Sequence, residues 1–593
     1  METLTELRRG TPEELLSRFG LERFRRGQRE AVEAALSGRD SLVVMPTGGG
    51  KSLCYQLPAL SDVGLVVVVS PLIALMSDQL GRVREAGVRA SMLASGMEEG
   101  HNAEALRAIA SGETQLVLAS PERFGSRAFR EALEGRRVGL FVVDEAHCVA
   151  EWGHDFRPDY LRLGEAITSL GRPAVMAATA TATPRVAQEI AERLGLRDWL
   201  SVRSGFDRPN ISFDVVSVEG KGALSRKWAA LMHVLGEAEA RPAIVYCGTR
   251  KDTESVASRL AGEGMRTVAY HAGMDPQERR ESQAAFMEDR AEVVVATNAF
   301  GMGVDKANVR TVAHWALPTS LEAYYQEAGR GGRDGARARA LLLSARMDLG
   351  RLIRFISERE TNVEDVKRFV AGLRASSEDE SVAIGHGQLG ERQRVLLSIA
   401  ERAGAVELEP GGRDGLLVRL TGRGSPSRAA AAIRAARDRS WEAYRSIERY
   451  STGEATCRRR QILEHFGDPA QGAPTGRCCD VCDRDEDLQR AVEAPIAKSR
   501  RAGAGGSARS RGANGAAGPP GEPVDEGEFE RLKAWRWERA EGKPAYTVAA
   551  NAVLEEVLRA RPSTRGELLE IRGIGEAFCR KHGESLLEEL ARL

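Results

Sequence analysis

The sequence predicts an α/β protein in which two parallel-sheet lobes follow one another along the chain, with smaller, largely helical parts after them. Three observations support this prediction. Short valine-rich runs alternate with amphipathic helical stretches over most of residues 1–345. These runs fall into two series, with a boundary near residues 204–214. Beyond residue 350 the alternation ends, so the rest of the chain must be organised differently.

The apolar runs are four to six residues long, as expected for strands that are buried on both faces. The first series comprises Ser41–Met45, Leu65–Ser70, Gln115–Ala119, Leu140–Val143 and Ala174–Ala177. The second series comprises Ala243–Cys247, Thr267–Tyr270, Val293–Thr297 and Thr311–Trp315. Amphipathic stretches between them are typical of crossover helices. We therefore expect one lobe over residues 1–205 and a second over residues 206–350.

The pattern changes over residues 351–428. Helical stretches such as Gly390–Ala403 precede two short expected strands, Val406–Leu408 and Leu416–Leu420, which are separated by a turn-rich segment. Helices followed by a β-hairpin are consistent with a winged-helix-like segment. The pattern is weak, so another small fold stays open for this stretch.

The last part of the chain divides into three segments. Residues 429–486 are helical, rich in Ala and Arg, and end in a cysteine cluster, which predicts a small subdomain. Residues 487–525 are rich in Gly and Arg and cannot bury enough apolar surface to fold alone, which predicts a flexible linker. Helical periodicity returns over residues 526–593, which predicts a small all-helical domain.

Composition limits the class of protein. The 593 residues correspond to roughly three to five domains. The 85 basic and 85 acidic residues balance, but a neutral protein still binds nucleic acid where a basic stripe is local. No apolar run approaches the ~20 residues that span a bilayer, and residues 1–30 have no signal-peptide core. We expect a soluble cytoplasmic protein with no membrane partner.

A glycine-rich loop follows the first expected strand and leads into a helical stretch, Leu53–Leu60. Glycines allow backbone N–H groups to turn toward phosphate oxygens, and a helix N-terminus favours anions. We expect Lys51 at the β- and γ-phosphates of a nucleotide and Ser52 on Mg²⁺. Met45 departs from the common pattern, which has glycine at that position. The expected phosphate loop comprises Thr47, Gly48, Gly49, Gly50, Lys51 and Ser52.

The strand Leu140–Val143 ends in two acids, Asp144 and Glu145. An acid at a strand end beside a phosphate loop stands where a magnesium-binding carboxylate is needed. We expect Asp144 to hold the Mg²⁺ shell and Glu145 to orient or deprotonate the attacking water.

Two long stretches resemble one helicase family. Residues 45–57 read MPTGGGKSLCYQL, and residues 144–160 read DEAHCVAEWGHDFRPDY. Both are similar to the RecQ family of superfamily 2 DNA helicases. The resemblance extends over both lobes, the cysteine cluster and the C-terminal domain. It implies two tandem RecA-like lobes that use ATP and Mg²⁺.

The resemblance also implies nucleotide contacts in the first lobe. Residues 24–28, FRRGQ, resemble the segment that reads adenine, with Arg25 and Gln28 at the nucleotide. Leu21 stands where many relatives have an aromatic residue and offers only apolar contact to the base. This departure leaves the strength of adenine selection open.

Two motifs of the second lobe complete the implied ATP site. Residues 296–305, ATNAFGMGVD, resemble motif V, with Asp305 at the nucleotide. Residues 326–335, QEAGRGGRDG, resemble motif VI. By this resemblance Arg333, with Arg330 beside it, reaches the γ-phosphate and stabilises charge that develops in the transition state.

The family's aromatic-rich loop is the implied DNA contact. Aromatic rings and an arginine stack on unpaired bases, worth about 1–3 kcal/mol per base. Segments 70–75 and 120–123 resemble backbone-binding motifs, and residues 179–181 resemble the motif that couples hydrolysis to lobe movement. The matching residues of the aromatic-rich loop are Trp152, His154, Phe156 and Arg157.

Four cysteines are candidate metal ligands: Cys457, Cys478, Cys479 and Cys482. Four thiolates suit a closed, structural zinc site, and bunched cysteines in a reducing compartment indicate metal before disulfide. Many relatives space the last three as two Cys-x-x-Cys steps, whereas here Gly476 takes the usual first place. The other cysteines, Cys54, Cys148, Cys247 and Cys579, are expected to be free thiols.

The C-terminal domain resembles an HRDC module, with Lys533, Trp535, Arg536 and Tyr546 as candidate nucleic-acid contacts. A structural or protein-binding helical bundle is the open alternative. In familiar members of the family a winged helix follows the zinc site, but here only the linker separates Cys482 from this domain. Either the wing has moved into residues 351–428, or the chain lacks it.

These features predict an ATP-dependent 3′-to-5′ DNA helicase for recombination and repair, with ATP, Mg²⁺ and Zn²⁺. The direction rests on the resemblance alone. Single-stranded and forked DNA are the expected partners, and a single-strand-binding protein is a candidate. We expect a monomer associated with a bacterial nucleoid. Two alternatives stay open: an RNA helicase of the same superfamily, and a non-catalytic DNA-binding scaffold with a vestigial ATP site.

Overall fold

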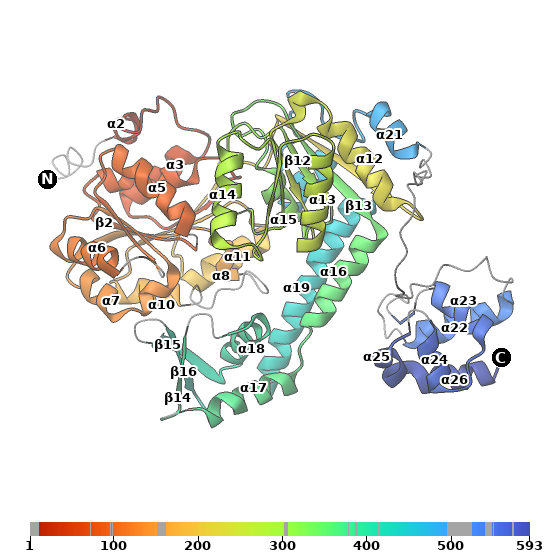
Figure 1. The fold of residues 1–593 in the computed structure, drawn as a ribbon. Helices are drawn as coiled ribbons and strands as arrows, with labels where there is room; N and C mark the ends of the chain where they lie inside the picture. The colour runs from red at the N-terminus through yellow and green to blue at the C-terminus, as the bar shows by residue number, and fades with distance from the viewer. Residues whose placement is uncertain are drawn as a thin grey trace. The chain divides into compact units, whose positions relative to one another are not determined.

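The structure is a computed structural model that describes residues 11–71, 73–94, 97, 99–150, 160, 162–301, 306–377, 379–385, 389–411, 415–494, 525–539, 548–549, 551–571 and 574–593. These residues fall into two compact units, one within Met1–Ala497 and the other within Lys498–Leu593. The first unit contains both parallel-sheet lobes, and the second is helical (Figure 1).

Lobe 1 is a seven-stranded sheet in the order β3-β4-β2-β5-β6-β1-β7, and every neighbouring pair is parallel. Four central strands are buried along nearly their whole length, as valine-rich runs require. The strands are β1 (Ser41–Val44), β2 (Leu65–Val69), β3 (Ala90–Leu93), β4 (Leu116–Ala119), β5 (Val138–Val143), β6 (Ala174–Thr179) and β7 (Leu200–Arg203). The helices are α2 (Pro12–Ser17), α3 (Gln28–Ser37), α4 (Lys51–Gln56), α5 (Ile73–Glu85), α6 (Glu99–Ser111), α7 (Arg127–Leu133), α8 (His147–Ala150), α10 (Leu163–Ser169) and α11 (Pro184–Leu194).

Lobe 2 is a six-stranded sheet in the order β10-β11-β9-β12-β13-β8, again entirely parallel. Its strands are β8 (Ile211–Val218), β9 (Ala243–Tyr246), β10 (Thr267–Tyr270), β11 (Val293–Ala296), β12 (Thr311–His314) and β13 (Ala338–Ala345). Its helices are α12 (Ala223–Leu235), α13 (Arg250–Gly262), α14 (Pro276–Met287) and α15 (Leu321–Ala328). Both predicted parallel sheets are therefore confirmed.

Four strands of these sheets were not expected from the sequence. β3 and β13 are rich in Ala, Leu and Met, residues that favour helices as much as strands. β7 is a short, partly exposed edge strand, and β8 lies where a lobe boundary was expected. These strands form through pairing with distant neighbours, which local pattern does not report.

Residues 363–420 form a small α/β module. Its three antiparallel strands lie in the order β14-β16-β15, so the expected hairpin of β15 (Val406–Gly411) and β16 (Gly415–Leu420) is extended by β14 (Ser381–Gly385). Helices α17 (Val363–Ala375) and α18 (Glu391–Arg402) pack on this sheet and share its core. The chain enters through α16 (Arg346–Arg359) and leaves through α19 (Pro426–Thr452), which lie side by side (Figure 1).

The cysteine-containing subdomain follows α19. It contains α20 (Arg458–His465) and α21 (Glu486–Glu493). The expected linker began at residue 487, but α21 is an ordered helix because Leu488 is buried against α12 and Val492 packs on the same core. The linker boundary predicted from composition was therefore wrong by about two helical turns.

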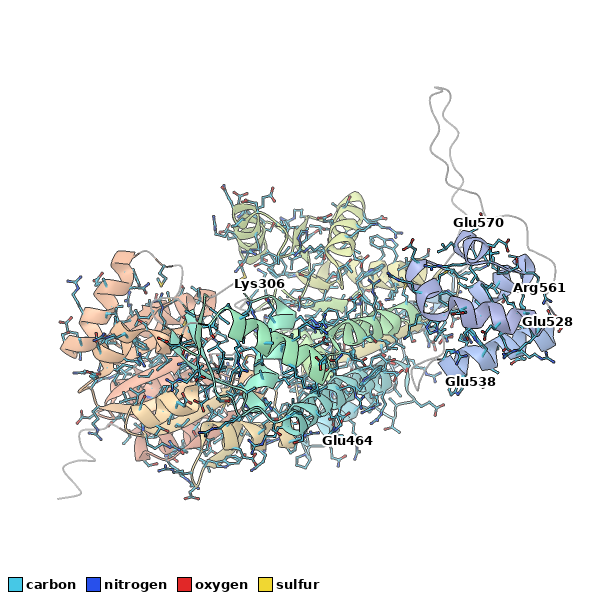
Figure 2. All side chains as sticks on the ribbon, turned by 90° about the horizontal axis from the view of Figure 1, so that it is seen from below. Lys306, Glu464, Glu528, Glu538, Arg561 and Glu570 are labelled. Atoms are coloured by element: carbon cyan, nitrogen blue, oxygen red, sulfur yellow. The ribbon has the colours of Figure 1, made fainter. Side chains whose placement is uncertain are left out.

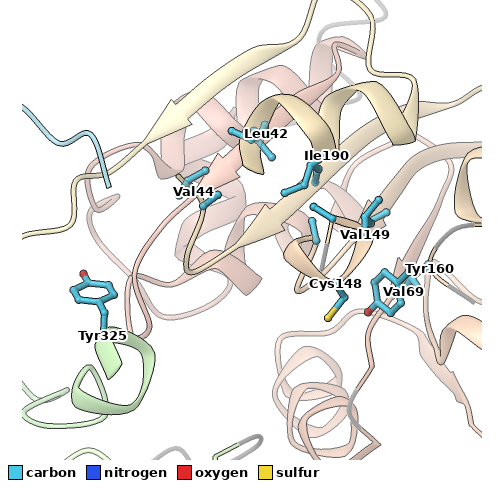
Figure 3. Packing of buried hydrophobic residues seen from close by; sticks show 14 of the residues in the cluster. Leu42, Val44, Val69, Cys148, Val149, Tyr160, Ile190 and Tyr325 are labelled. Carbon is cyan, nitrogen blue, oxygen red and sulfur yellow. The ribbon is translucent and has the colours of Figure 1, made fainter. Parts of the chain in front are cut away.

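One buried core joins lobe 1, the connecting segment 204–210 between β7 and β8, and α15 of lobe 2. Figure 3 shows Leu42 and Val44 of β1 near Ile190 of α11, with Tyr325 of α15 in the same cluster. The Tyr325 hydroxyl donates to the Phe206 carbonyl over 2.7 Å, and Phe206 stacks on Phe466 with ring centroids 4.4 Å apart. Packed aromatic residues thus join α15 of lobe 2 to the connecting segment and to the cysteine-containing subdomain.

The second unit is a helical bundle around a core that includes Leu532, Leu554, Leu568 and Leu586. An ion pair between Arg561 and Glu528, both labelled in Figure 2, joins the segment after α23 to α22. Its helices are α22 (Glu526–Arg539), α23 (Asn551–Ala560), α24 (Arg565–Glu570), α25 (Glu576–Phe578) and α26 (Glu584–Ala591). Among the helices that the structure describes, none combines the length and apolarity needed to cross a membrane.

Candidate active site and metal centre

The phosphate loop stands between the end of β1 and the first residue of α4, Lys51, as expected. Gly48 and Gly50 have φ values of 82° and 81°, a left-handed region in which side chains are strained. A Cβ atom on Gly50 would also lie 2.3 Å from Nε2 of Gln28. The left-handed backbone therefore favours glycine at this position, and a larger residue would also displace the Gln28 amide.

Neighbouring side chains brace this loop. Gln28, which is buried, donates from Nε2 to the carbonyls of Gly49 (3.3 Å) and Gly50 (3.1 Å), and Arg25 donates to the Gly48 carbonyl. The Lys51 ammonium donates to the Met45 carbonyl over 3.1 Å. Gln28 therefore supports the loop, and its expected role toward adenine stays a prediction.

Asp144 and Glu145 follow β5 and lie at the same edge of the sheet as the phosphate loop. The carboxyl ends of parallel strands share one edge. Burial, together with the charge of Glu145, raises the pKa of Asp144 to about 6. Burial also acts to raise the pKa of Glu145, but His147 and the charges of Lys51 and Arg330 outweigh it and lower that pKa to about 2. Glu145 is thus held as an anion.

The backbone of Glu145 is strained. Its φ of 48° is a left-handed conformation, which costs a non-glycine residue about 1–2 kcal/mol. The His147 ring contacts the Glu145 carboxylate: its Nδ1 lies 3.2 Å from Glu145 Oε2 and 2.9 Å from the Thr179 hydroxyl at the end of β6. The carboxylate is therefore linked to the segment expected to couple hydrolysis to lobe movement.

A buried polar network joins Ser52 to Asp144, and the sequence did not reveal it. The Tyr55 hydroxyl lies 3.1 Å from Oε1 of Gln79 and 3.3 Å from Oδ2 of Asp144, and Gln79 Nε2 donates to the Ser52 hydroxyl over 3.2 Å. Tyr55 belongs to α4 and Gln79 to α5. Residue spacing along the chain could not show that these two helices meet at the expected metal ligands.

The phosphate loop, Gln79 and the two acids line a cavity of about 740 Å³ that opens between the two lobes. Lobe 2 contributes Arg330, which is buried, and Arg333, whose Cγ would lie 3.6 Å from a Cβ on Gly48. The motif VI turn therefore lies against the phosphate loop. The lining includes the expected site residues Arg25, Gln28, Thr47, Gly48, Gly50, Lys51, Ser52, Asp144, Glu145, Arg330 and Arg333, and also Leu21.

The four candidate cysteines converge. The Sγ atoms of Cys457, Cys478, Cys479 and Cys482 all lie within 4.8 Å of one another, and those of Cys457 and Cys478 are 3.6 Å apart. Four sulfurs at about 2.3 Å from a tetrahedral zinc ion are separated by about 3.8 Å, so the cluster fits zinc. The adjacent pair Cys478–Cys479 is accommodated because both side chains reach the same point.

Four family models match successive parts of the chain. They are the DEAD/DEAH box helicase model over residues 25–190, the helicase conserved C-terminal domain over 226–335, the RecQ zinc-binding model over 425–483 and the HRDC domain over 525–590. The chain is 33% identical to the ATP-dependent DNA helicase RecQ of Bacillus subtilis (strain 168), over 96% of this chain and 97% of that protein.

The chain belongs to the RecQ family. Another RecQ, from Pasteurella multocida (strain Pm70), is 32% identical over 96% of this chain and 92% of its own length. The RecQ of Haemophilus influenzae is 41% identical over 58% of this chain and 55% of its own. The RecQ zinc-binding match begins at residue 425, just before α19, and ends at residue 483, just after the last cysteine.

Several RecQ-type expectations concern residues outside the described ranges. These are the aromatic-rich loop residues Trp152, His154, Phe156 and Arg157, the motif V residue Asp305, and Tyr546 of the HRDC domain. Their roles stay predictions.

The HRDC domain differs from the expected nucleic-acid surface. Trp535 is buried and donates from its indole N–H to Ser585 over 2.9 Å, and Arg536 is buried and donates to the Ala549 carbonyl over 2.9 Å. Both residues stabilise the bundle, so their assignment to a DNA-contacting surface was wrong. The neighbouring Trp537 is 71% exposed instead.

Proposed function

We propose that this chain is an ATP-dependent DNA helicase that translocates 3′-to-5′ on single-stranded DNA and unwinds duplex or branched DNA in recombination and repair. The observation that carries the proposal is the cavity between the lobes. In it a phosphate loop, Lys51 and the two strand-end acids face Arg330 and Arg333 of the other lobe. No single lobe holds all of these groups.

The residues present fit ATP and Mg²⁺. The N-terminus of α4 and the Lys51 ammonium favour the triphosphate anion. The Ser52 hydroxyl and the Asp144 carboxylate are hard oxygen donors of the kind that Mg²⁺ prefers, and Gln79 and Tyr55 hold them in one network. Mg²⁺ bound there supplies positive charge to the β- and γ-phosphate oxygens.

The chain's own groups then have distinct tasks. Glu145, kept anionic at the cavity wall, accepts a hydrogen bond from the attacking water and orients it. Lys51 neutralises the phosphate oxygens from lobe 1, while Arg330 and Arg333 stabilise the charge that develops on the transferred phosphoryl group. Because these cations belong to different lobes, nucleotide binding favours closure and its loss favours opening.

On the DNA side, the aromatic-rich loop at residues 152–157 and Asp305 are retained as proposed contacts to DNA and nucleotide. Single-stranded and forked DNA are the proposed partners, and a single-strand-binding protein is a candidate. We also propose that the chain acts as a monomer in the bacterial cytoplasm, at the nucleoid.

The module at residues 363–420 supports a displaced wing. β14, the strand before α18, pairs with β16, the second strand of the hairpin. This strand order is the one expected of a winged helix, in which the sheet packs on the helices. We propose domains at 1–205, 206–350, 351–428, 429–486 and 526–593, with the linker at 487–525 reduced to the part beyond α21.

The test is unwinding of 3′-tailed, 5′-tailed and forked duplexes, with ATP and without it. Unwinding of 3′-tailed and forked substrates only, and only with ATP, is expected. Preference for 5′-tailed DNA would overturn the direction. Stronger stimulation of ATP hydrolysis by RNA than by single-stranded DNA would favour the RNA helicase, and unwinding that survives Lys51→Ala would favour the scaffold with a vestigial site.

A further inference from the structure

The guanidinium of Arg208 touches loops of both lobes. Arg208 belongs to the segment 204–210 that connects β7 to β8. Its Nη1 lies 3.3 Å from the Thr47 carbonyl of the phosphate loop and 2.7 Å from the Gly329 carbonyl. Its Nη2 lies 2.8 Å from the Gly331 carbonyl and 3.4 Å from the Gly332 carbonyl. The three contacts in lobe 2 hold the backbone on both sides of Arg330, and the fourth joins Arg208 to the phosphate loop.

The turn that Arg208 holds is tightly built. Gly332 has a φ of 55°, and a Cβ there would lie 2.4 Å from Nδ2 of Asn210. Asn210 donates to the carbonyls of Gly332 (2.7 Å) and Ala336 (2.8 Å). Two residues of the connecting segment therefore support the turn that carries Arg330 and Arg333.

The cysteine-containing subdomain fixes Arg208 from behind. Arg459, two residues after Cys457, is fully buried and donates to the Arg208 carbonyl over 2.9 Å and to the Asp207 carboxylate over 2.5 Å. On the same side, Asp468 accepts from the Phe206 amide over 2.6 Å. The segment is thus clamped to the subdomain, while the Arg208 side chain points at the cavity loops.

The chemistry of this contact suits arginine alone. Burial lowers the pKa of Arg208, and Tyr325 opposes that effect while Arg25 adds to it. Its side chain donates to backbone carbonyls, which a planar, five-donor guanidinium reaches in several directions at once. A lysine ammonium at the end of a flexible stem would not span these carbonyls in one fixed plane.

We propose that Arg208 is a positioning residue that sets the motif VI turn against the phosphate loop, so that Arg330 and Arg333 meet the phosphates of ATP. The proposal rests on the proposed function, because it acts through these two arginines. Through Arg459 it also makes the cysteine-containing subdomain part of the structure that places them.

The test compares Arg208→Ala and Arg208→Lys with the parent in the full chain, by DNA-stimulated ATP hydrolysis. A displacement of about 1 Å at a reacting group costs about 100-fold, so kcat should fall by about that factor while KM for ATP changes by less than about threefold. The matched control is Arg203→Ala, in the strand just before, because the Arg203 guanidinium donates to the Phe466 carbonyl over 3.2 Å. That control should keep the parent kcat.

A double-mutant cycle separates positioning from general loosening. If Arg208 acts through the turn, adding Arg208→Ala to the Arg330→Ala/Arg333→Ala variant should lower the residual rate by less than about threefold. A further loss of about 100-fold would overturn the proposal, as would a parent-like kcat for Arg208→Ala. If Arg208→Ala lowers the melting temperature by more than Arg203→Ala does, the kcat of Arg208→Lys is compared with that of the parent instead.

Hydrogen exchange keeps this outcome distinct from failure of the proposed function. In Arg208→Lys the amides of residues 329–333 should exchange faster than in the parent, whether or not the parent hydrolyses ATP. A parent without DNA-stimulated hydrolysis would overturn the proposed function. Unchanged exchange at this turn would overturn the role of Arg208.

Discussion

The two lobes share one architecture and differ in what stands at the ends of their strands. Each is a fully parallel sheet with crossover helices. In lobe 1 the strand ends carry a phosphate loop, a lysine and two acids, whereas in lobe 2 the charged groups that line the cavity are the guanidiniums of Arg330 and Arg333. The comparison teaches that the sheet supplies a common edge and that the residues placed there divide the chemistry.

The lobes also differ in how their groups are held. In lobe 1 the loop and acids are ordered by contacts within the lobe, from Gln28, Tyr55, Gln79 and His147. In lobe 2 the turn with Arg330 is held by Arg208 of the connecting segment. Residues of lobe 1 should therefore determine the affinity for nucleotide, and residues of lobe 2 should mainly determine kcat.

The largest expected effect comes from lobe 2. Arg333→Ala should lower kcat for ATP by about 10³-fold or more, because an arginine that meets developing charge contributes about 10³–10⁵. Nucleotide affinity, measured with a fluorescent ADP, should change by less than about threefold. Arg337→Ala, four residues on, is the control, since its guanidinium lies at the Thr475 carbonyl. Equal losses of affinity and kcat would contradict the division between lobes.

Lys51→Ala in lobe 1 should have the next largest effect on kcat. Loss of one charge-stabilising donor costs about 10²–10³ in kcat, and here the affinity for ATP should weaken as well. Equilibrium binding and steady-state hydrolysis check the two effects. Lys251→Ala, an exposed lysine of lobe 2, should leave both unchanged. If Lys51→Ala kept the parent affinity for ATP, the expected difference between Lys51→Ala and Arg333→Ala in nucleotide binding would be wrong.

Tyr55→Phe should have a moderate and selective effect. It removes one hydroxyl between Gln79 and Asp144, a loss of about 0.5–1.5 kcal/mol, which is up to about tenfold in apparent Mg²⁺ affinity. Mn²⁺ binding by electron paramagnetic resonance and a Mg²⁺ titration of hydrolysis check it. Tyr246→Phe, which loses a 2.8 Å bond to the Phe300 carbonyl in lobe 2, should not shift the metal requirement. A shift in both variants would point to general loosening.

The smallest expected effect lies at a bridge between α19 and lobe 1. Arg439 donates to Glu189 over 2.8 Å, with both side chains partly exposed, so the ion pair contributes about 1 kcal/mol or less. Arg439→Ala should lower the melting temperature by about 2 °C or less and leave kcat unchanged. Arg185→Ala, which loses a more exposed pair with Glu442, should shift it less. A large change in kcat would show that the contact between α19 and lobe 1 also affects turnover.

Most of the fold and much of the site could be predicted from local pattern. The phosphate loop, the acids after β5 and motif VI are short contiguous motifs, and the cysteines stand out by residue type although Cys457 lies 21 positions before Cys478. The structure brings each of these groups together as expected. Arg208, Tyr55 and Gln79 could not be found this way, because each acts on residues more than twenty positions away. Their types are also common in helices and loops.

The errors have similar physical causes. α21 was assigned to the linker because it is mostly charged or polar and has only a few apolar residues. The burial of Leu488 and Val492 depends on α12, which is far away in the chain. Trp535 and Arg536 were assigned to a surface because an aromatic–basic pair resembles a nucleic-acid contact. In the bundle their polar atoms find internal partners instead.

Strand β8 is the last strand of the lobe 2 sheet, so one side of its backbone has no neighbouring strand. The cysteine cluster covers that side: the Phe213 amide donates to the Cys478 carbonyl over 3.0 Å, and the Val215 amide donates to Asp480 over 3.3 Å. An open sheet edge is a template for pairing with other chains. The cysteine-containing subdomain therefore covers a sheet edge that is otherwise open to pairing. Removal of the zinc that its four thiolates fit should expose β8 and lead to self-association before either RecA-like lobe unfolds.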